Sequence, residues 1–267
     1  MSPMSPRTLR PRAGGLNPRS ISGLAAWWDV STSVTLNATT ISAIQDLSGN
    51  SRTLLQATGG SQPTYVASAI NGRAAASFDG TRFMAVSSST AAFAFIHQST
   101  GATIYAVINP TSVASVNFLM GNNSSTNAVV GFNIGLNDSG AARRFQGNVT
   151  NGSQSVASLQ FNSFFSPMGA WASVSSVFDP ANATTTSRFI PFRDGNQISP
   201  SSDTSVSVAV PSSGNAGGNF VLGSCFEASG GIAFQGSVGE VLVYSGVHSS
   251  ATRVAVQKYL KSKWATP

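Results

Sequence analysis

The chain has 267 residues, of which 41% are apolar and only 9% are charged. This length suits one large β domain with a full core, and solubility must rest on Ser, Thr, Asn and Gly, because an average globular domain is about 25% charged. The single cysteine, Cys225, excludes an intrachain disulfide and a cysteine-rich metal site. Its strand-like surroundings predict a buried, inert thiol.

The net charge of +6 comes from the two ends of the chain. The first 20 residues carry four arginines and no acid, and residues 249–264 carry four basic residues and no acid. The seven basic and nine acidic residues between them give the body a formal charge of about −2. A nucleic-acid-binding face needs Lys and Arg interleaved with aromatic residues along one surface. The pattern therefore argues against nucleic acid as the main partner.

Residues 1–20 are predicted to form an extended, basic arm in front of a single domain of residues 21–267. Prolines at positions 3, 6, 11 and 18 remove backbone donors and fix φ, so this stretch does not fit into a sheet. Two interpretations are open: a tail without fixed structure, or an arm that docks on a neighbouring subunit. The docking arginines would be Arg7, Arg10, Arg12 and Arg19.

The first half of the body consists of short apolar segments separated by turn signals. Residues 24–30 are apolar and aromatic enough for a strand on the core, and Ser-Gly-Asn within residues 46–50 marks a turn. A Pro-Thr-Tyr segment follows at 63–65. Residues 74–80 and 83–86 are expected as short strands around an Asp-Gly turn.

The second half of the body repeats this pattern of apolar segments separated by turn residues. Residues 103–110 form a continuous apolar strand that ends at a proline, and residues 117–121 and 131–136 alternate with the two-residue period of a strand buried on one face. A tryptophan-led strand follows at 171–179. Asp194-Gly195 then predicts a hairpin with a type I′ turn, whose two central residues both need φ > 0.

The chain ends in a predicted strand, residues 234–246, and one short helix, residues 249–264. Ser249 or Ser250 is the expected N-cap. One helix face should pack as a lid over one end of the sandwich, with Lys258 and Lys261 directed outward. The packing residues at helical spacing are Val256, Tyr259, Leu260 and Trp264.

These segments, in this order, resemble the concanavalin A-like, laminin G-like jelly-roll family found in phage and bacterial surface proteins. The shared features are a tryptophan strand, a D-x-S-G-N loop, a P-x-Y segment, an F-D-G turn and the final strand and helix. The resemblance covers residues 21–264. It implies an all-β sandwich of two antiparallel sheets with one short C-terminal helix, and surface binding as the class of function.

Catalytic residues of the kind that hydrolases of this fold use are missing. Glycoside hydrolysis needs two carboxylates across the scissile bond, and the family's hydrolases place them in an E-x-D-x-x-E run. The only glutamates here, Glu227 and Glu240, have no acid two or three residues away. We therefore expect the protein to be non-enzymatic and Glu240 to have a structural role. His248, in the turn before the helix, is expected to be exposed.

Calcium is the one cofactor that the resemblance suggests, because relatives often hold Ca²⁺ at a loop rim with aspartates and backbone carbonyls. Asp46 and Asp79 are the candidate ligands. The alternative is that both carboxylates bond their own turns, as Asx residues in tight turns normally do. No other cofactor is expected.

Sugar binding needs an exposed aromatic platform with amide and hydroxyl partners. The candidate aromatic contacts are Trp28 and Tyr65, and the candidate amides are Asn122 and Asn123. The alternative for the tryptophan is a place in the core.

Two functions follow. In the first, the chain is a non-enzymatic virion-surface protein, a phage capsid decoration or a fibre or tail appendage, whose arm docks on capsid or other virion proteins. The arm, the charge-poor body and the lack of a signal-peptide-like apolar block motivate this interpretation. The alternative is an extracellular, lectin-like module that binds a cell-surface glycan. Neither inserts into a membrane, since no apolar run is long enough to span one, and both are compatible with a homo-oligomer.

Overall fold

The computed structural model describes residues 15–112, 117–123, 129–137, 143–165, 168–199, 202–203, 209–227 and 232–267. Three of the predicted docking arginines, Arg7, Arg10 and Arg12, lie outside the described residues.

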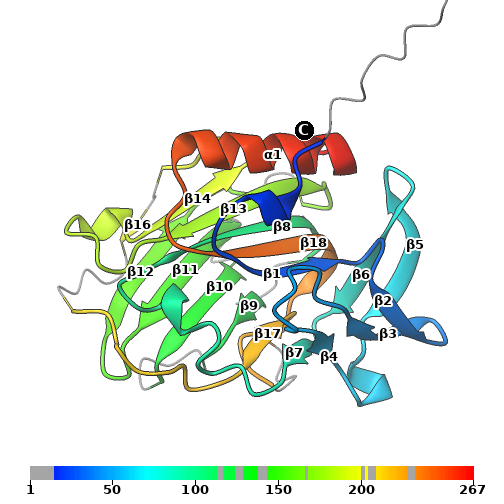
Figure 1. The fold of residues 1–267 in the computed structure, drawn as a ribbon, viewed down its shortest axis with the longest axis horizontal. Coiled ribbons are helices and arrows are strands. Elements are labelled where there is room, and N and C mark those ends of the chain that lie inside the picture. The colour runs from blue at the N-terminus through cyan, green and yellow to red at the C-terminus, as the bar shows by residue number, and fades with distance from the viewer. Residues whose placement is uncertain are drawn as a thin grey trace, which may run out of the picture.

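The described chain is built from short strands, a few 3₁₀ turns and one α-helix near the C-terminus (Figure 1). The helix α1 spans Ser250–Trp264. The strands are β1 (Leu24–Asp29), β2 (Val34–Asn37), β3 (Thr40–Ile44), β4 (Leu54–Leu55), β5 (Thr64–Ile70), β6 (Arg73–Asp79), β7 (Met84–Val86), β8 (Ala102–Pro110), β9 (Asn117–Gly121), β10 (Gly131–Asn137), β11 (Arg144–Thr150), β12 (Ser155–Phe161), β13 (Ala172–Phe178), β14 (Phe189–Arg193), β15 (Asn196–Gln197), β16 (Ser202–Asp203), β17 (Phe220–Leu222) and β18 (Gln235–Ser245).

The named strands pair antiparallel and form two layers. The first layer runs β15-β14-β13-β8-β18, and the far edge of β18 pairs with β1 along one part and with β6 along another. The second layer runs β7-β17-β9-β10-β11-β12-β16. Strands β5, β3 and β4 connect the layers from β6 to β7. This arrangement confirms the predicted sandwich of antiparallel sheets.

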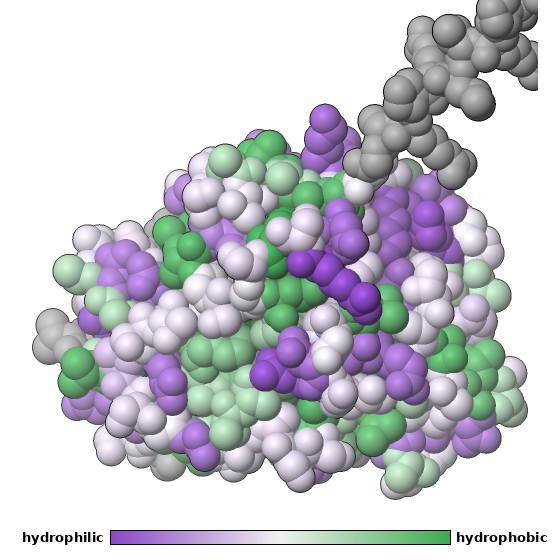
Figure 2. Space-filling view, viewed as in Figure 1, coloured by the Kyte–Doolittle hydropathy of each residue, from purple (hydrophilic) through white to green (hydrophobic). Residues whose placement is uncertain are grey.

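The main core lies between the two layers and takes alternate residues from each strand. On β8 and β18, Ile104, Ala106, Val241 and Val243 point into it, where they meet the inward phenylalanines of the second layer. The molecular surface is largely near-neutral in hydropathy on the face shown in Figure 2, with smaller hydrophilic and hydrophobic groups interspersed. A surface of hydroxyls, amides and glycine fits the low charge content of the sequence.

The other face of β8 and β18 carries the helix. Tyr105, Val107, Leu242 and Tyr244 form a second apolar cluster with the buried side of α1. Figure 1 shows α1 along the outer face of the first layer, so the prediction of a lid over one end of the sandwich is wrong. The physical reason is the strand period: both faces of β8 and β18 are apolar, and the outer face needs its own cover.

The close fit of α1 depends on a glycine. A Cβ atom at Gly239 would lie 2.8 Å from the ring of Trp264, closer than real Cβ contacts. The packing side of α1 was predicted correctly, since Val256, Leu260 and Trp264 are fully buried while Lys258 and Lys261 are exposed.

Several local predictions are confirmed. Ser249 is the N-cap of α1, and its side chain accepts a hydrogen bond from the backbone of Thr252. Asp194 and Gly195 both have positive φ, 52° and 88°, as a type I′ turn requires. Cys225 is fully buried, and burial raises the pKa of its thiol to about 12.

Residues 15–20, counted with the predicted arm, lie against the sandwich. Pro18 is buried in a 3₁₀ turn, Pro18–Ser20, and its carbonyl oxygen accepts a hydrogen bond of 3.1 Å from the Tyr244 hydroxyl. Leu16 packs beside the cluster under α1. Arg19 is exposed, and its Nε donates to the carbonyl oxygen of Leu47 at 2.6 Å. Arg19 is thus held by its own domain.

Within the described ranges, no helix is long and apolar enough to cross a membrane.

Candidate functional site

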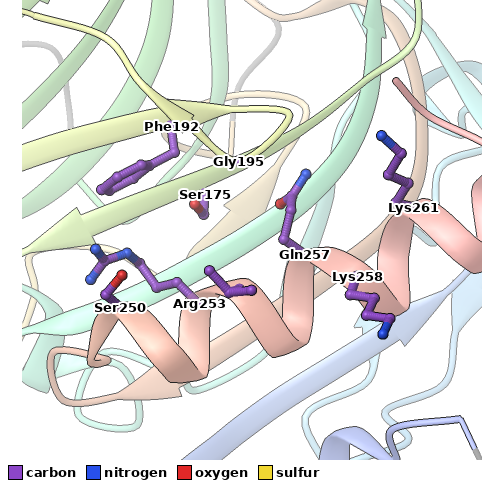
Figure 3. A pocket seen from close by; sticks show the side chains of 9 residues that line it. Ser175, Phe192, Gly195, Ser250, Arg253, Gln257, Lys258 and Lys261 are labelled. Carbon is purple, nitrogen blue, oxygen red and sulfur yellow. The ribbon is translucent and has the colours of Figure 1, made fainter.

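A groove runs along one side of α1, between the helix and the hairpin of β14 and β15 (Figure 3). It holds about 270 Å³. This volume lies just below the roughly 300–1,000 Å³ typical of small-molecule sites, which suits a short ligand segment. We call it the α1 groove, and its main lining residues are Ser175, Phe192, Gly195, Arg253, Gln257 and Lys261.

The helix side of the α1 groove is a row of polar side chains. Arg253, Gln257 and Lys261 follow one another at four-residue intervals, and residues four apart lie on the same face of a helix. In Figure 3, Gln257 and Lys261 point toward the hairpin and Arg253 points toward Phe192. Lys258 also borders the groove but extends on the opposite side of the helix (Figure 3).

The hairpin side approaches the helix closely at Gly195. A Cβ atom there would lie 3.4 Å from Cγ of Gln257, and the positive φ of Gly195 disfavours any other residue. The turn predicted from Asp194-Gly195 therefore forms one wall of the α1 groove.

Arg253 is held in a fixed position at one end of the α1 groove. Its guanidinium carbon lies 4.5 Å from the ring centre of Phe192, and one of its nitrogens donates to the carbonyl oxygen of His248 at 2.7 Å. A guanidinium has five N–H donors, so this arrangement leaves donors for a ligand.

Gln257 presents an unsatisfied acceptor. The residue is 9% exposed, and its Nε2 donates to the Ser173 hydroxyl. Its Oε1 is buried and has no hydrogen-bond partner in the part of the chain that the structure describes. A buried acceptor left without a partner costs about 1–3 kcal/mol. A bound donor would relieve that cost.

The charge of the α1 groove is positive. Arg253, Lys258 and Lys261 line it, no acid does, and none of the three forms an ion pair with another described residue. Asp194 stands next to the lining residue Gly195, but its carboxylate accepts from the backbone and hydroxyl of Ser173.

The opposite end of α1 is closed by a saturated network around Glu240, which is fully buried. Its Oε1 accepts from the indole N–H of Trp27 at 2.7 Å and from the Tyr259 hydroxyl at 2.8 Å. Its Oε2 accepts from the indole N–H of Trp264 at 2.5 Å and lies 2.9 Å from the Lys263 ammonium. The prediction of a structural Glu240 agrees with these contacts.

Lys263 joins a second acid to this network. Its Nζ lies 2.6 Å from Oδ2 of Asp29, whose other oxygen accepts from the backbone and hydroxyl of Ser31. Burial alone would raise the pKa of Asp29, but Lys263 and Ser31 outweigh it and hold that pKa below its ordinary value. Burial and the charge of Glu240 raise the pKa of Tyr259.

Asp29 and Glu240 are the kind of carboxylate pair that glycoside hydrolysis uses, but their setting is unsuitable. They are 2% and 0% exposed, and their oxygens are occupied by Lys263, indoles and hydroxyls. A general acid or base must reach the substrate directly or through one water. This pair instead fastens the helix to the sheet.

The candidate calcium ligands sit in separate turns with occupied carboxylates. Asp46 accepts from the backbones of Trp27, Ser48 and Arg52. Asp79 accepts from Thr81 and pairs with Arg82 at 2.7 Å. In the part of the chain that the structure describes, no three His, Cys, Asp or Glu residues gather where a metal ion could bind.

Three of the four candidate glycan contacts are buried, so the prediction that they contact a sugar is wrong. Trp28 is 1% exposed and packs on Phe93 and Phe220, because inward side chains of β1 enter the main core. Asn122 and Asn123 are 0% and 1% exposed. Tyr65 is half-buried and packs beside the main core.

The two buried asparagines have structural roles instead. Asn122 Oδ1 accepts from the backbone of Phe132 at 2.9 Å. Asn123 Nδ2 donates to the Thr150 hydroxyl, and its Oδ1 accepts from Asn133. The amide-rich sequence thus stabilises the strand ends of the second layer.

His248 is also corrected, since it is buried rather than exposed. Its Nδ1 forms a hydrogen bond of 2.8 Å with the Tyr105 hydroxyl, and the ring packs on Tyr105 and Tyr244. Burial, and secondarily the charge of Arg253, lower its pKa to about 4.

Sequence reasoning missed the α1 groove. The available signal was the row of Arg253, Gln257 and Lys261 on a helix without acids, but the hairpin that completes the groove is distant in sequence.

No family model matches the chain, and no curated protein matches its sequence. Solved structures share its fold. Domain 4 of AbnA, a GH43 extracellular arabinanase from Geobacillus stearothermophilus in complex with arabinotriose, has a TM-score of 0.56 and 15% identity over 88% of this chain and 97% of that one. The CBM40 of the Ruminococcus gnavus IT-sialidase bound to α2,3-sialyllactose has a TM-score of 0.50 and 17% identity over 68% of this chain and 95% of that one.

A third similar structure belongs to a larger enzyme. The Trypanosoma rangeli sialidase in complex with the inhibitor DANA has a TM-score of 0.55 and 10% identity over 92% of this chain but 34% of the sialidase. At these identities the likeness shows a shared β-sandwich fold, and function has to be argued from this chain's own residues.

Proposed function

We propose that the protein is a non-enzymatic carbohydrate-binding module whose α1 groove takes a short segment of a glycan. The observation that carries the proposal is Gln257, which lines this groove and whose buried Oε1 has no hydrogen-bond partner among the described residues. Ring hydroxyls are directed donors, and a sugar site needs such partners next to apolar surface.

The other lining groups fit the same kind of ligand. Val254 is 63% exposed at the groove, so it offers apolar contact to the C–H face of a sugar. Ser250 is exposed at the start of the helix and adds a hydroxyl. The fold gives only general support: two of the similar structures hold a sugar, arabinotriose in the arabinanase domain and α2,3-sialyllactose in the CBM40.

A non-enzymatic role agrees with the placement of the acids. No carboxylate of the described residues lines the α1 groove, and Asp29 and Glu240, which stand opposite each other on β1 and β18, are buried with their oxygens occupied. Glycoside hydrolysis by two carboxylates therefore has no place in this groove.

The test is glycan binding by the full chain and by Gln257→Leu, measured on a glycan array and then by titration calorimetry. Loss of one neutral hydrogen bond should weaken binding about three- to tenfold. Gln45→Leu, at an exposed position directly after β3, is the control and should bind like the wild type. Both variants should keep the Tm of the wild type, so that a change in binding does not reflect unfolding. Equal binding by Gln257→Leu, or no glycan binding by the wild type, would overturn the proposal.

A virion-surface location with a docking arm stays a prediction. Its arginines Arg7, Arg10 and Arg12 lie outside the described residues, and Arg19 bonds within its own domain.

A further inference from the structure

We infer that the ligand of the α1 groove is a segment of an acidic polysaccharide, in which carboxylates of uronic acid residues contact Arg253 and Lys261 and a hydroxyl between them donates to Gln257. The inference rests on the proposed function and names the class of glycan. The juxtaposition that carries it is a cation, an unsatisfied amide acceptor and a second cation along one side of α1.

The first step is the uncompensated charge. The helix from Ser250 to Trp264 contains four basic residues and no acid. Of these four, only Lys263 lies within ion-pair distance of described acids, which are Asp29 and Glu240. Arg253, Lys258 and Lys261 have no such partner among the residues that the structure describes, so their positive charge is available to a ligand.

The second step is the spacing of the row. Arg253 and Lys261 are eight positions apart, which corresponds to about 12 Å along the axis of a helix. A single carboxylate does not span that distance, whereas a chain of several sugar rings places charges along it. Gln257 lies halfway between them. Its carbonyl oxygen, Oε1, would repel a carboxylate at this point but can accept a hydrogen bond from a hydroxyl.

The third step is preorganisation. Arg253 is fixed by the ring of Phe192 and by the carbonyl oxygen of His248, so little side-chain freedom remains to be lost on binding. A planar guanidinium matches a carboxylate with two parallel hydrogen bonds. Lys261 is exposed and contributes a flexible point charge at the other end of the row.

A nucleic acid is a different polyanion, and the groove does not favour it. Binding of single strands combines cations with aromatic faces on which bases stack. Phe192 is the aromatic residue of the groove, but it is 8% exposed and Arg253 lies over its ring. The groove offers hydrogen-bonding groups and aliphatic contact instead of a stacking face.

The experiment compares matched acidic and neutral sugars. Titration calorimetry with the full chain would use trimers of galacturonic acid and of mannuronic acid, neutral trimers of galactose and of mannose, and a short single-stranded DNA. We expect at least one acidic trimer to bind more tightly than its neutral counterpart. Lys261→Gln should weaken that binding about three- to tenfold, since an exposed charge pair contributes modestly.

The control variant is Arg143→Gln, which removes one positive charge directly before β11, a strand of the second layer, and should leave acidic-trimer binding unchanged. Equal binding of neutral and acidic trimers would overturn the acidic class while the proposed function stands. Failure of every saccharide to bind would overturn both. Binding of the DNA alone, weakened by Lys261→Gln, would replace the polysaccharide with a nucleic acid.

Discussion

Two sides of α1 use their basic side chains in opposite ways. On the side that contacts β1 and β18, Lys263 is 12% exposed and lies between two buried acids. On the side that faces the β14–β15 hairpin, Arg253 and Lys261 border an open groove and pair with no described acid. The first side therefore fastens the helix to the sheet, while the second keeps charge and an amide acceptor available to a ligand.

Strand register explains the difference. In the pairing of β1 with β18, Asp29 stands opposite Glu240, so two acids meet on one face of the sheet. Like charges directly opposite each other are destabilising, and Lys263 compensates them. Beneath the groove, β13 presents Ser175 and β14 presents Phe192, so no acid of the described residues neutralises Arg253 or Lys261.

The largest expected effect comes from breaking the buried network around Glu240. Glu240→Ala leaves two indole N–H groups and the Tyr259 hydroxyl without their acceptor. Removing one member of a buried ion pair typically costs about 3–5 kcal/mol. Chemical denaturation should show this loss. Glu227→Ala, at an exposed glutamate, should stay within about 0.5 kcal/mol. Similar losses in the two variants would contradict the fastening role of the network.

An intermediate effect is expected from pH, through the histidine at the start of α1. The pKa of His248 is lowered to about 4, and burial also lowers the pKa of His97. The unfolded chain therefore binds more protons than the folded one below the ordinary histidine pKa of about 6.5. Stability should fall as pH falls from about 6.5 toward 4, seen as a falling Tm.

The variant His248→Gln separates the effect of histidine protonation on stability from that of the acidic residues. In His248→Gln the loss of Tm between pH 6.5 and 4 should be smaller than in the wild type. Asp29 affects stability in a different pH range. Because its pKa in the folded protein is lowered, its stabilising contribution is lost only as the pH falls below the ordinary pKa of 3.8. An identical pH profile in the wild type and in His248→Gln would show that His248 does not titrate as the structure implies.

Much of the fold was predictable because it depends on local patterns. The type I′ turn at Asp194, the N-cap at Ser249 and the buried side of α1 follow from turn chemistry and helical spacing. The network and the α1 groove were not predictable, since they join residues far apart in sequence. Trp27 and Glu240 are 213 positions apart, and only the register of β1 against β18 brings them together.

The smallest expected effect tests the side of α1 that borders the groove. Lys261→Gln removes an exposed charge with no described acidic partner, so it should change the free energy of unfolding by no more than about 0.5 kcal/mol. The same substitution at Lys263 leaves Asp29 and Glu240 facing each other without a cation, and it should cost several times more. Urea denaturation of the two variants at the same pH measures both. Equal losses would mean that Lys261 also contributes to stability, and a stabilising lysine is a weaker candidate for binding an acidic glycan.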